Sequence, residues 1–141
     1  MPESGNRKPA AILAAVGFAL LFLFQVLLAL GVPLGRAAFG GRNASLSPEL
    51  RVASLVSALL IIGAIWTVLV RAGAITAGRR SRGIAHWLIW GFVGLFSLSA
   101  FANFTSSSPW ERFGWGPFAV MLVICCVIVA LGPRAGLDPE A

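Results

Sequence analysis

Four long apolar stretches alternate with short polar segments along the chain. The apolar stretches cover residues 10–31, 53–70, 84–102 and 113–132. A helix needs about 20 apolar residues to cross the roughly 30 Å hydrocarbon core of a bilayer. The pattern therefore predicts an all-α integral membrane bundle of four transmembrane helices. We expect one membrane domain, residues 1–141, with flexible tails at residues 1–9 and 133–141.

The composition excludes a soluble domain. Hydrophobic residues make up 58% of the chain and charged residues only 11%, whereas about 25% of the residues in an average soluble domain are charged. So few charges cannot cover the surface of a soluble fold, and a chain this apolar is not disordered.

The first apolar stretch is longer than the roughly 7–15 apolar residues of a signal peptide, so we expect it to remain as a span.

The positive charges predict how the chain is oriented. The two terminal segments and the connection between the second and third spans hold seven basic residues: Arg7, Lys8, Arg71, Arg79, Arg80, Arg82 and Arg134. The other two connections hold four: Arg36, Arg42, Arg51 and Arg112. Cytoplasmic segments carry the excess of Lys and Arg, so both termini are predicted to be cytoplasmic. The composition, rich in Ala, Gly and Arg, is typical of bacteria and favours the bacterial cytoplasmic membrane.

The sequence lacks the residues that several classes of function require. The net charge of +6 comes from arginines that flank spans, with no basic soluble segment to bind nucleic acid. No ionisable residue lies in the middle of a span, where proton-coupled exporters need one. Cys125 and Cys126 are adjacent in an apolar run and His86 is the only histidine. We therefore expect no metal, no cofactor and no enzymatic activity.

Gln25 is the one strongly polar side chain inside the first span. Two interpretations of it remain open. It is either a contact to a pore or ligand, or the partner in an interhelical hydrogen bond of roughly 0.6–2 kcal/mol.

Two extracytoplasmic segments resemble each other. Residues 45–51 and 106–112 both fit the pattern S-x-S-P-x-x-R. The pattern predicts helix starts, with Ser47 and Ser108 as N-caps and proline at the first helical position. Glu111 stands three residues after Ser108, which predicts a capping box. The repeated pattern reflects either the duplication of a helical hairpin or convergence on a common way to begin a helix. The sequence leaves both explanations open.

The polar residues of the extracytoplasmic side form the main candidate site. Its members are Arg36, Arg42, Arg51, Asn103, Ser108, Glu111, Arg112 and Trp115. In one interpretation they form an interlocked lid, in which Glu49 and Glu111 pair with arginines. In the other, the arginines left unpaired bind an anion or a lipid head group.

Two motifs in this region carry a resemblance. The run P-L-G-R-A-A-F-G-G covers residues 33–41, and the pattern N-x-x-S-x-S-x-x-E-R-x-x-W-G-P covers residues 103–117. With the four similarly spaced spans, the chain resembles a family of small, uncharacterised four-span bacterial integral membrane proteins. The resemblance implies an architecture and no activity.

The sequence thus favours a non-enzymatic multi-pass membrane protein, with an accessory or interaction role exerted through membrane lipid or a partner. The expected partners are lipid and either another membrane protein or further copies of the chain. The alternative is a small oligomeric channel or transporter that uses Gln25 and the extracytoplasmic arginines.

Overall fold

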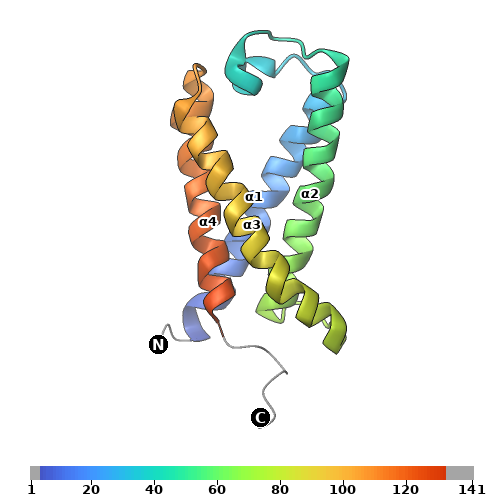
Figure 1. The fold of residues 1–141 in the computed structure, drawn as a ribbon, viewed down its shortest axis with the longest axis vertical. Helices are drawn as coiled ribbons and strands as arrows, with labels where there is room; N and C mark the ends of the chain where they lie inside the picture. Colours follow the sequence, from blue (N-terminus) through green and yellow to red (C-terminus); the bar gives the residue numbers. More distant parts are fainter. Residues whose placement is uncertain (1–3, 133–141) are drawn as a thin grey trace.

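The fold is an all-α bundle, as the apolar stretches predict. The computed structural model describes residues 4–132, and this part of the chain contains no strand. Its long helices are α1 (Ser4–Ala29), α2 (Pro48–Ala72), α3 (Arg79–Thr105) and α4 (Gly116–Leu131), the last preceded by a π-helical turn, η3 (Glu111–Trp115). Two short 3-10 turns, η1 (Gly35–Ala37) and η2 (Phe39–Gly41), lie between α1 and α2 (Figure 1).

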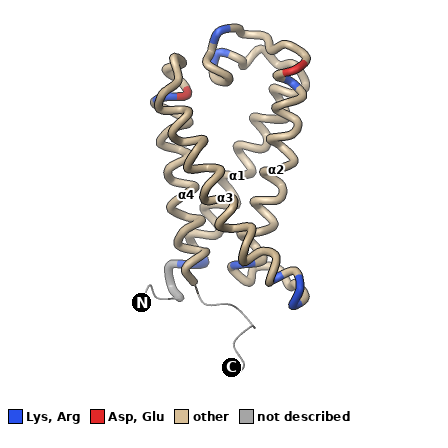
Figure 2. Tube along the Cα trace, in the orientation of Figure 1, with Lys and Arg blue, Asp and Glu red and all other residues tan. Residues whose placement is uncertain are grey.

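Four helical segments are long and apolar enough to cross a membrane. They are Arg7–Ala29, Pro48–Ala72, Arg79–Thr105 and Glu111–Leu131. Figure 2 shows the described charged residues gathered at the two ends of the bundle, with the middle free of them. This distribution is that of a multi-pass membrane protein, because charges are costly in the hydrocarbon region.

The helices extend beyond the apolar stretches that predict them. α2 begins at Pro48 rather than at residue 53, and α3 begins at Arg79 rather than at residue 84. Residues 4–9, expected in a flexible tail, already belong to α1, whereas residues 1–3 and 133–141 lie outside the described chain. Hydropathy marks only the length in hydrocarbon, and a helix can continue through the polar head-group layer.

The helices form two hairpins that cross. The most extensive contacts join α1 to α2 and α3 to α4. α3 begins beside the end of α2 and runs diagonally until it lies beside the fourth span (Figure 1). α2 and α3 therefore diverge toward the end that holds residues 30–47. We call residues 30–47 the lid, and this end of the bundle the lid end.

A plug of large side chains fills the middle of the bundle. Phe18 and Leu122 are fully buried, and Ile61 and Phe96 are nearly so. The rings of Phe18 and Phe96 lie 4.9 Å apart between centroids. The close approach of α1 to α4 depends on Gly17, because a Cβ there would lie 2.8 Å from Leu122 Cδ2.

Arginines satisfy helix C-termini at both ends of the bundle. The buried Arg71 donates from Nη2 to the carbonyls of Ala130 at 2.8 Å and of Gly132 at 3.2 Å. Arg51 donates from Nε to the carbonyl of Ala29 at 2.9 Å. The last carbonyls of a helix have no partner within it, and a cation there also interacts favourably with the helix dipole.

A matched pair of substitutions tests the central packing. Gly17→Ala places a methyl group against the fully buried Leu122, and overpacking of this kind typically costs ~1–3 kcal/mol. Gly94→Ala on α3 meets nothing within 4 Å and improves helix propensity. We expect Gly17→Ala to lower the thermal midpoint in detergent and Gly94→Ala to maintain or raise it. Equal midpoints would show that α1 and α4 do not pack as described.

Candidate functional site

A cavity of about 940 Å³ lies under the lid. α1, α2, α3 and the fourth span all contribute to its walls, and lid residues between Gly35 and Leu46 contribute its roof. The cavity fills the space between the diverging helices. Its floor is the central plug, because Ile61, Phe96 and Leu122 line it and are buried.

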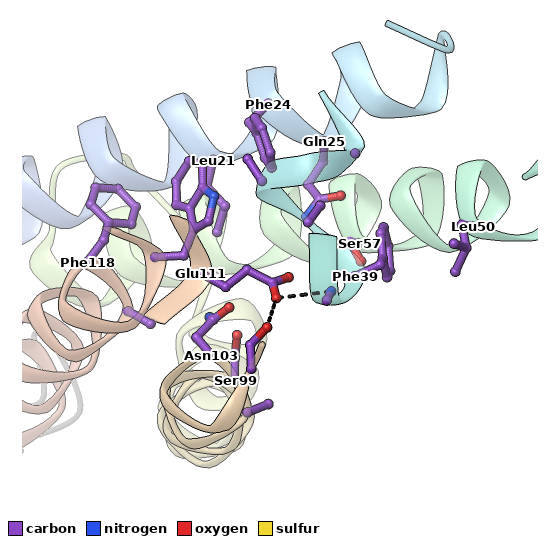
Figure 3. Close-up of a pocket in the computed structure, with 18 of the residues that line it drawn as sticks. Leu21, Phe24, Gln25, Phe39, Leu50, Ser57, Ser99, Asn103, Glu111 and Phe118 are labelled. Carbon is purple, nitrogen blue, oxygen red and sulfur yellow. Dashed lines mark hydrogen bonds between the residues drawn. The ribbon is translucent and has the colours of Figure 1, made fainter. Parts of the chain in front are cut away.

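The cavity is polar at one end and apolar at the other. Its charged and amide side chains are Gln25, Arg42, Asn43, Asn103 and Glu111. Toward the plug the walls are mainly aliphatic and aromatic: Leu21, Leu60, Leu95 and Phe118 line them, besides the three floor residues. Figure 3 shows Gln25 from α1 and Asn103 from α3 on either side of the Glu111 side chain.

The lid depends on glycines that allow close backbone contacts. The amide of Gly35 donates to the carbonyl of Ala44 at 2.8 Å, and a Cβ at Gly35 would lie 2.4 Å from the carbonyl oxygen of Asn43. Gly41 has a φ of +67°, and a Cβ there would lie 2.9 Å from the Cβ of Ser108. Phe39 has a φ of +50°, which is rare for a bulky residue and which the surrounding structure must enforce. Phe39 lines the cavity, so the strained position lies at the candidate site.

Three hydrogen bonds hold the lid to the start of the fourth span. The hydroxyl of Ser108 donates to the carbonyl of Arg36 at 2.8 Å, and the hydroxyl of Ser107 donates to the carbonyl of Gly40 at 3.1 Å. The amide of Gly40 donates to Oε2 of Glu111 at 3.0 Å. The two hairpins are thus joined across the roof of the cavity by residues distant in sequence.

Glu111 is the buried carboxylate of this site. Its side chain is only 8% exposed, and Oε2 accepts hydrogen bonds from the Gly40 amide and the Ser106 hydroxyl, both marked in Figure 3. Within residues 4–132, Oε1 of Glu111 receives no hydrogen bond from any donor. One carboxylate oxygen therefore anchors the lid while the other is left to the cavity.

The structure contradicts two expectations for this segment. The capping box is wrong, because the amide of Ser108 donates to the hydroxyl of Ser106 at 3.0 Å and not to Glu111. The pairing of Glu111 with an arginine is also wrong, because neutral donors hold the carboxylate in the described chain. Ser47 stands at the N-cap of α2 but makes no side-chain capping bond. Glu111 turns toward the lid because an unpaired amide under that roof would be costly.

The π-helical turn η3 accounts for the different start of the fourth span. Pro117 lies inside a continuous helical segment, where it has no N–H to donate to Phe113 and its ring crowds that carbonyl. A wider turn from Glu111 to Trp115 relieves this conflict, and the amide of Gly116 bonds to the carbonyl of Glu111. Such bulges occur frequently at functional sites, and this one lies against the cavity.

The predicted arginine cluster does not form a single site. Arg51 caps α1, and Arg112 donates from Nη2 to the carbonyl of Ser106 at 2.8 Å. The side chain of Arg36 is exposed, and only its carbonyl contributes to the lid. Arg42 is the one arginine among the residues lining the cavity, and its guanidinium is exposed at the rim.

The remaining predicted residues divide between cavity and packing roles. Oε1 of Gln25 is buried without a hydrogen-bond partner in the described chain. The side chain of Asn103 lines the same cavity. Trp115 packs against Phe24 at 4.6 Å and against Phe118 at 5.6 Å between ring centroids, which stabilises the wall.

Ser106, Gly40 and Phe39 belong to the two extracytoplasmic motifs, but the sequence assigned them no place in a cavity. Their positions in the roof depend on contacts between the hairpins, which leave no periodic signal. Cys125 and Cys126 are free and buried in the core. In the described chain, no group of three His, Cys, Asp or Glu residues is placed to hold a metal ion.

Substitution of Glu111 tests the anchor of the lid. Glu111→Ala leaves the Gly40 amide and the Ser106 hydroxyl without their acceptor, which typically costs ~1–3 kcal/mol per buried group. Glu111→Gln retains a carbonyl oxygen and should lose less. We expect thermal midpoints in detergent in the order wild type, Glu111→Gln, Glu111→Ala, with the exposed Glu49→Gln as an unchanged control. Four equal midpoints would contradict this role.

Comparison of the chain with known proteins finds no similar protein. No family model matches the sequence, and neither a curated protein nor a solved structure is significantly similar to it. The resemblance to four-span bacterial membrane proteins therefore stays a prediction.

Proposed function

We propose that this chain is a non-enzymatic membrane protein that acts by binding a lipid-like amphipathic molecule under its lid. The observation that carries the proposal is the cavity, with carboxylate and amide groups at the lid end and an apolar floor. A ligand with a polar head and an apolar tail satisfies both parts. The volume of about 940 Å³ lies within the range of roughly 300–1,000 Å³ typical of ligand cavities.

The ligand has a route into the cavity from the membrane. Leu60 on α2 and Leu95 on α3 both line the cavity, and their side chains are 46% and 43% exposed. Both residues lie along the apolar length of their spans. A lipid tail entering between α2 and α3 would exchange one apolar environment for another, so entry requires no passage through water.

The proposed orientation places the lid on the extracytoplasmic side of a bacterial cytoplasmic membrane. The beginning of α1 and the end of α4 both lie at the end of the bundle opposite the lid (Figure 1). Arg71 in the last turn of α2 and Arg79, Arg80 and Arg82 at the start of α3 lie at that same end. The positive-inside rule favours this end for the cytoplasm. The ligand would then come from the outer leaflet.

A small oligomeric channel or transporter is the second candidate. One observation favours its oligomeric part: Gly91 and Gly94 lie on an exposed face of α3, where a Cβ at either would meet nothing within 4 Å. Small residues let helices of neighbouring copies approach closely. The conduction path would have to run between copies, because Phe18 and Phe96 block the centre of one bundle.

Two serine substitutions on α3 test lipid binding. Ser99→Phe fills the cavity, whereas Ser97→Phe adds the same ring to an exposed position that does not line it. We expect native mass spectrometry of the detergent-purified protein to show retained phospholipid in the wild type and in Ser97→Phe. Ser99→Phe should lose most of it. Equal lipid retention in all three proteins would contradict the proposal, and a loss of oligomer in Ser97→Phe alone would favour the channel.

Cysteine labelling tests the orientation. Ser45 in the lid and Thr76 in the α2–α3 connection are exposed, while the two native cysteines are buried. In intact cells, a membrane-impermeant maleimide should react with Ser45→Cys and spare Thr76→Cys. The wild-type protein serves as the unlabelled control. The opposite labelling pattern would invert the topology.

A further inference from the structure

We infer that the head group held under the lid carries a protonated primary amine, so the preferred ligand is an aminophospholipid. This inference rests on the proposed function, and it names the chemistry that the polar end of the cavity recognises. Three features carry it: a buried carboxylate with one free oxygen, the absence of an arginine partner for that carboxylate, and an amide acceptor without a donor.

The carboxylate of Glu111 is arranged as an acceptor for a ligand. Oε2 is used twice within the protein, by the Gly40 amide and by the Ser106 hydroxyl. Oε1 has no protein donor among residues 4–132, and Glu111 lines the cavity. The lid thus fixes the position of the side chain through one oxygen and leaves the other for a donor inside the cavity.

The arginines near the lid end do not form a salt bridge with Glu111 in the described chain. Arg112 donates to the carbonyl of Ser106, and Arg51 donates to the carbonyl of Ala29. Arg42 lines the cavity, but in the described chain its guanidinium makes no salt bridge and extends into the exposed rim. A buried carboxylate without a counter-charge is costly, so a cationic group in the cavity would bind favourably.

The other polar groups are suited to N–H donors. Oε1 of Gln25 is buried and accepts no hydrogen bond from a described residue, although Gln25 lines the same cavity. Asn103 adds an amide on the opposite side of Glu111 (Figure 3). A primary ammonium has three N–H donors and no acceptor. It therefore matches a carboxylate in a cavity that two amide side chains also line.

Other head groups fit this arrangement less well. A quaternary choline head group has no N–H and would leave the oxygens of Gln25 and Glu111 without donors. An anionic glycerol head group would bring its phosphate toward Glu111 with no compensating cation. An aminophospholipid places its ammonium at Glu111, and its phosphate can lie toward the exposed Arg42 at the rim. The apolar floor then receives the upper part of the tails.

The test is competition among lipids in nanodiscs. Purified protein is equilibrated in bilayers of equimolar phosphatidylethanolamine, phosphatidylcholine and phosphatidylglycerol, and the tightly retained lipids are identified by native mass spectrometry. We expect phosphatidylethanolamine to be enriched over each of the others by about tenfold, the size expected for one hydrogen bond to a charged group. Equal retention of the three lipids, or enrichment of either of the others, would overturn the inference.

Two variants test which residues cause the preference for the amine head group. Glu111→Gln keeps an acceptor for the lid but removes the charge, so it should retain lipid and lose the preference for the amine. Gln25→Leu removes the unpartnered acceptor without removing a bond within the described protein, so it should weaken the preference and maintain the fold. Glu49→Gln, an exposed carboxylate outside the cavity lining, is the matched control and should bind as the wild type does. An unchanged preference in Glu111→Gln would contradict the role of the carboxylate.

The outcomes separate this inference from the proposed function. Lipid retained in a manner sensitive to Ser99→Phe but with no head-group preference would support the cavity and reject the amine. No cavity-dependent lipid at all would reject both. Free phosphoethanolamine, added to protein in detergent, distinguishes the two sources of the amine: protection against thermal unfolding by this soluble compound, without lipid enrichment, would show that the ligand is not a lipid.

Discussion

The hydrogen bond between the amide of Gly40 and the carboxylate of Glu111 joins the two hairpins at the lid end. The lid belongs to the first hairpin and Glu111 to the second, and their helices diverge beneath this contact. The roof of the cavity exists because the lid is docked there, and Ser107 and Ser108 strengthen the same junction. The Glu111 side chain thus contributes both to the closure of the lid and to the polarity of the cavity.

Two backbone requirements explain the hydrogen bonds at the ends of the molecule. The last carbonyls of a helix have no partner within it, and a buried backbone amide is costly to leave unpaired. Arg51 and Arg71 meet the first requirement at two helix C-termini, and Glu111 meets the second in the lid. Arg51 and Arg112 bond backbone carbonyls, and Arg36 and Arg42 are exposed, so Glu111 rather than an arginine is the buried charge of the cavity.

The central packing and the crossing of the helices shape the cavity. The plug around Phe18 and Phe96 fixes where α3 crosses the bundle, and the crossing separates α2 from α3 beyond that point. The π-helical turn before Pro117 and the left-handed backbone at Phe39 lie against the same space. Local strain concentrated at a cavity is a recognised feature of functional sites.

The sequence by itself determined the helical bundle and its four spans. Hydropathy and the cost of charge in a bilayer are local properties, so a single chain reveals them. Only the tertiary structure decided that Glu111 bonds the lid instead of Ser108, that Arg51 and Arg112 bond carbonyls, and that Gln25 lines a cavity. A carboxylate or an arginine has several partners of similar energy nearby in sequence, and the choice among them depends on which helices the central packing brings together.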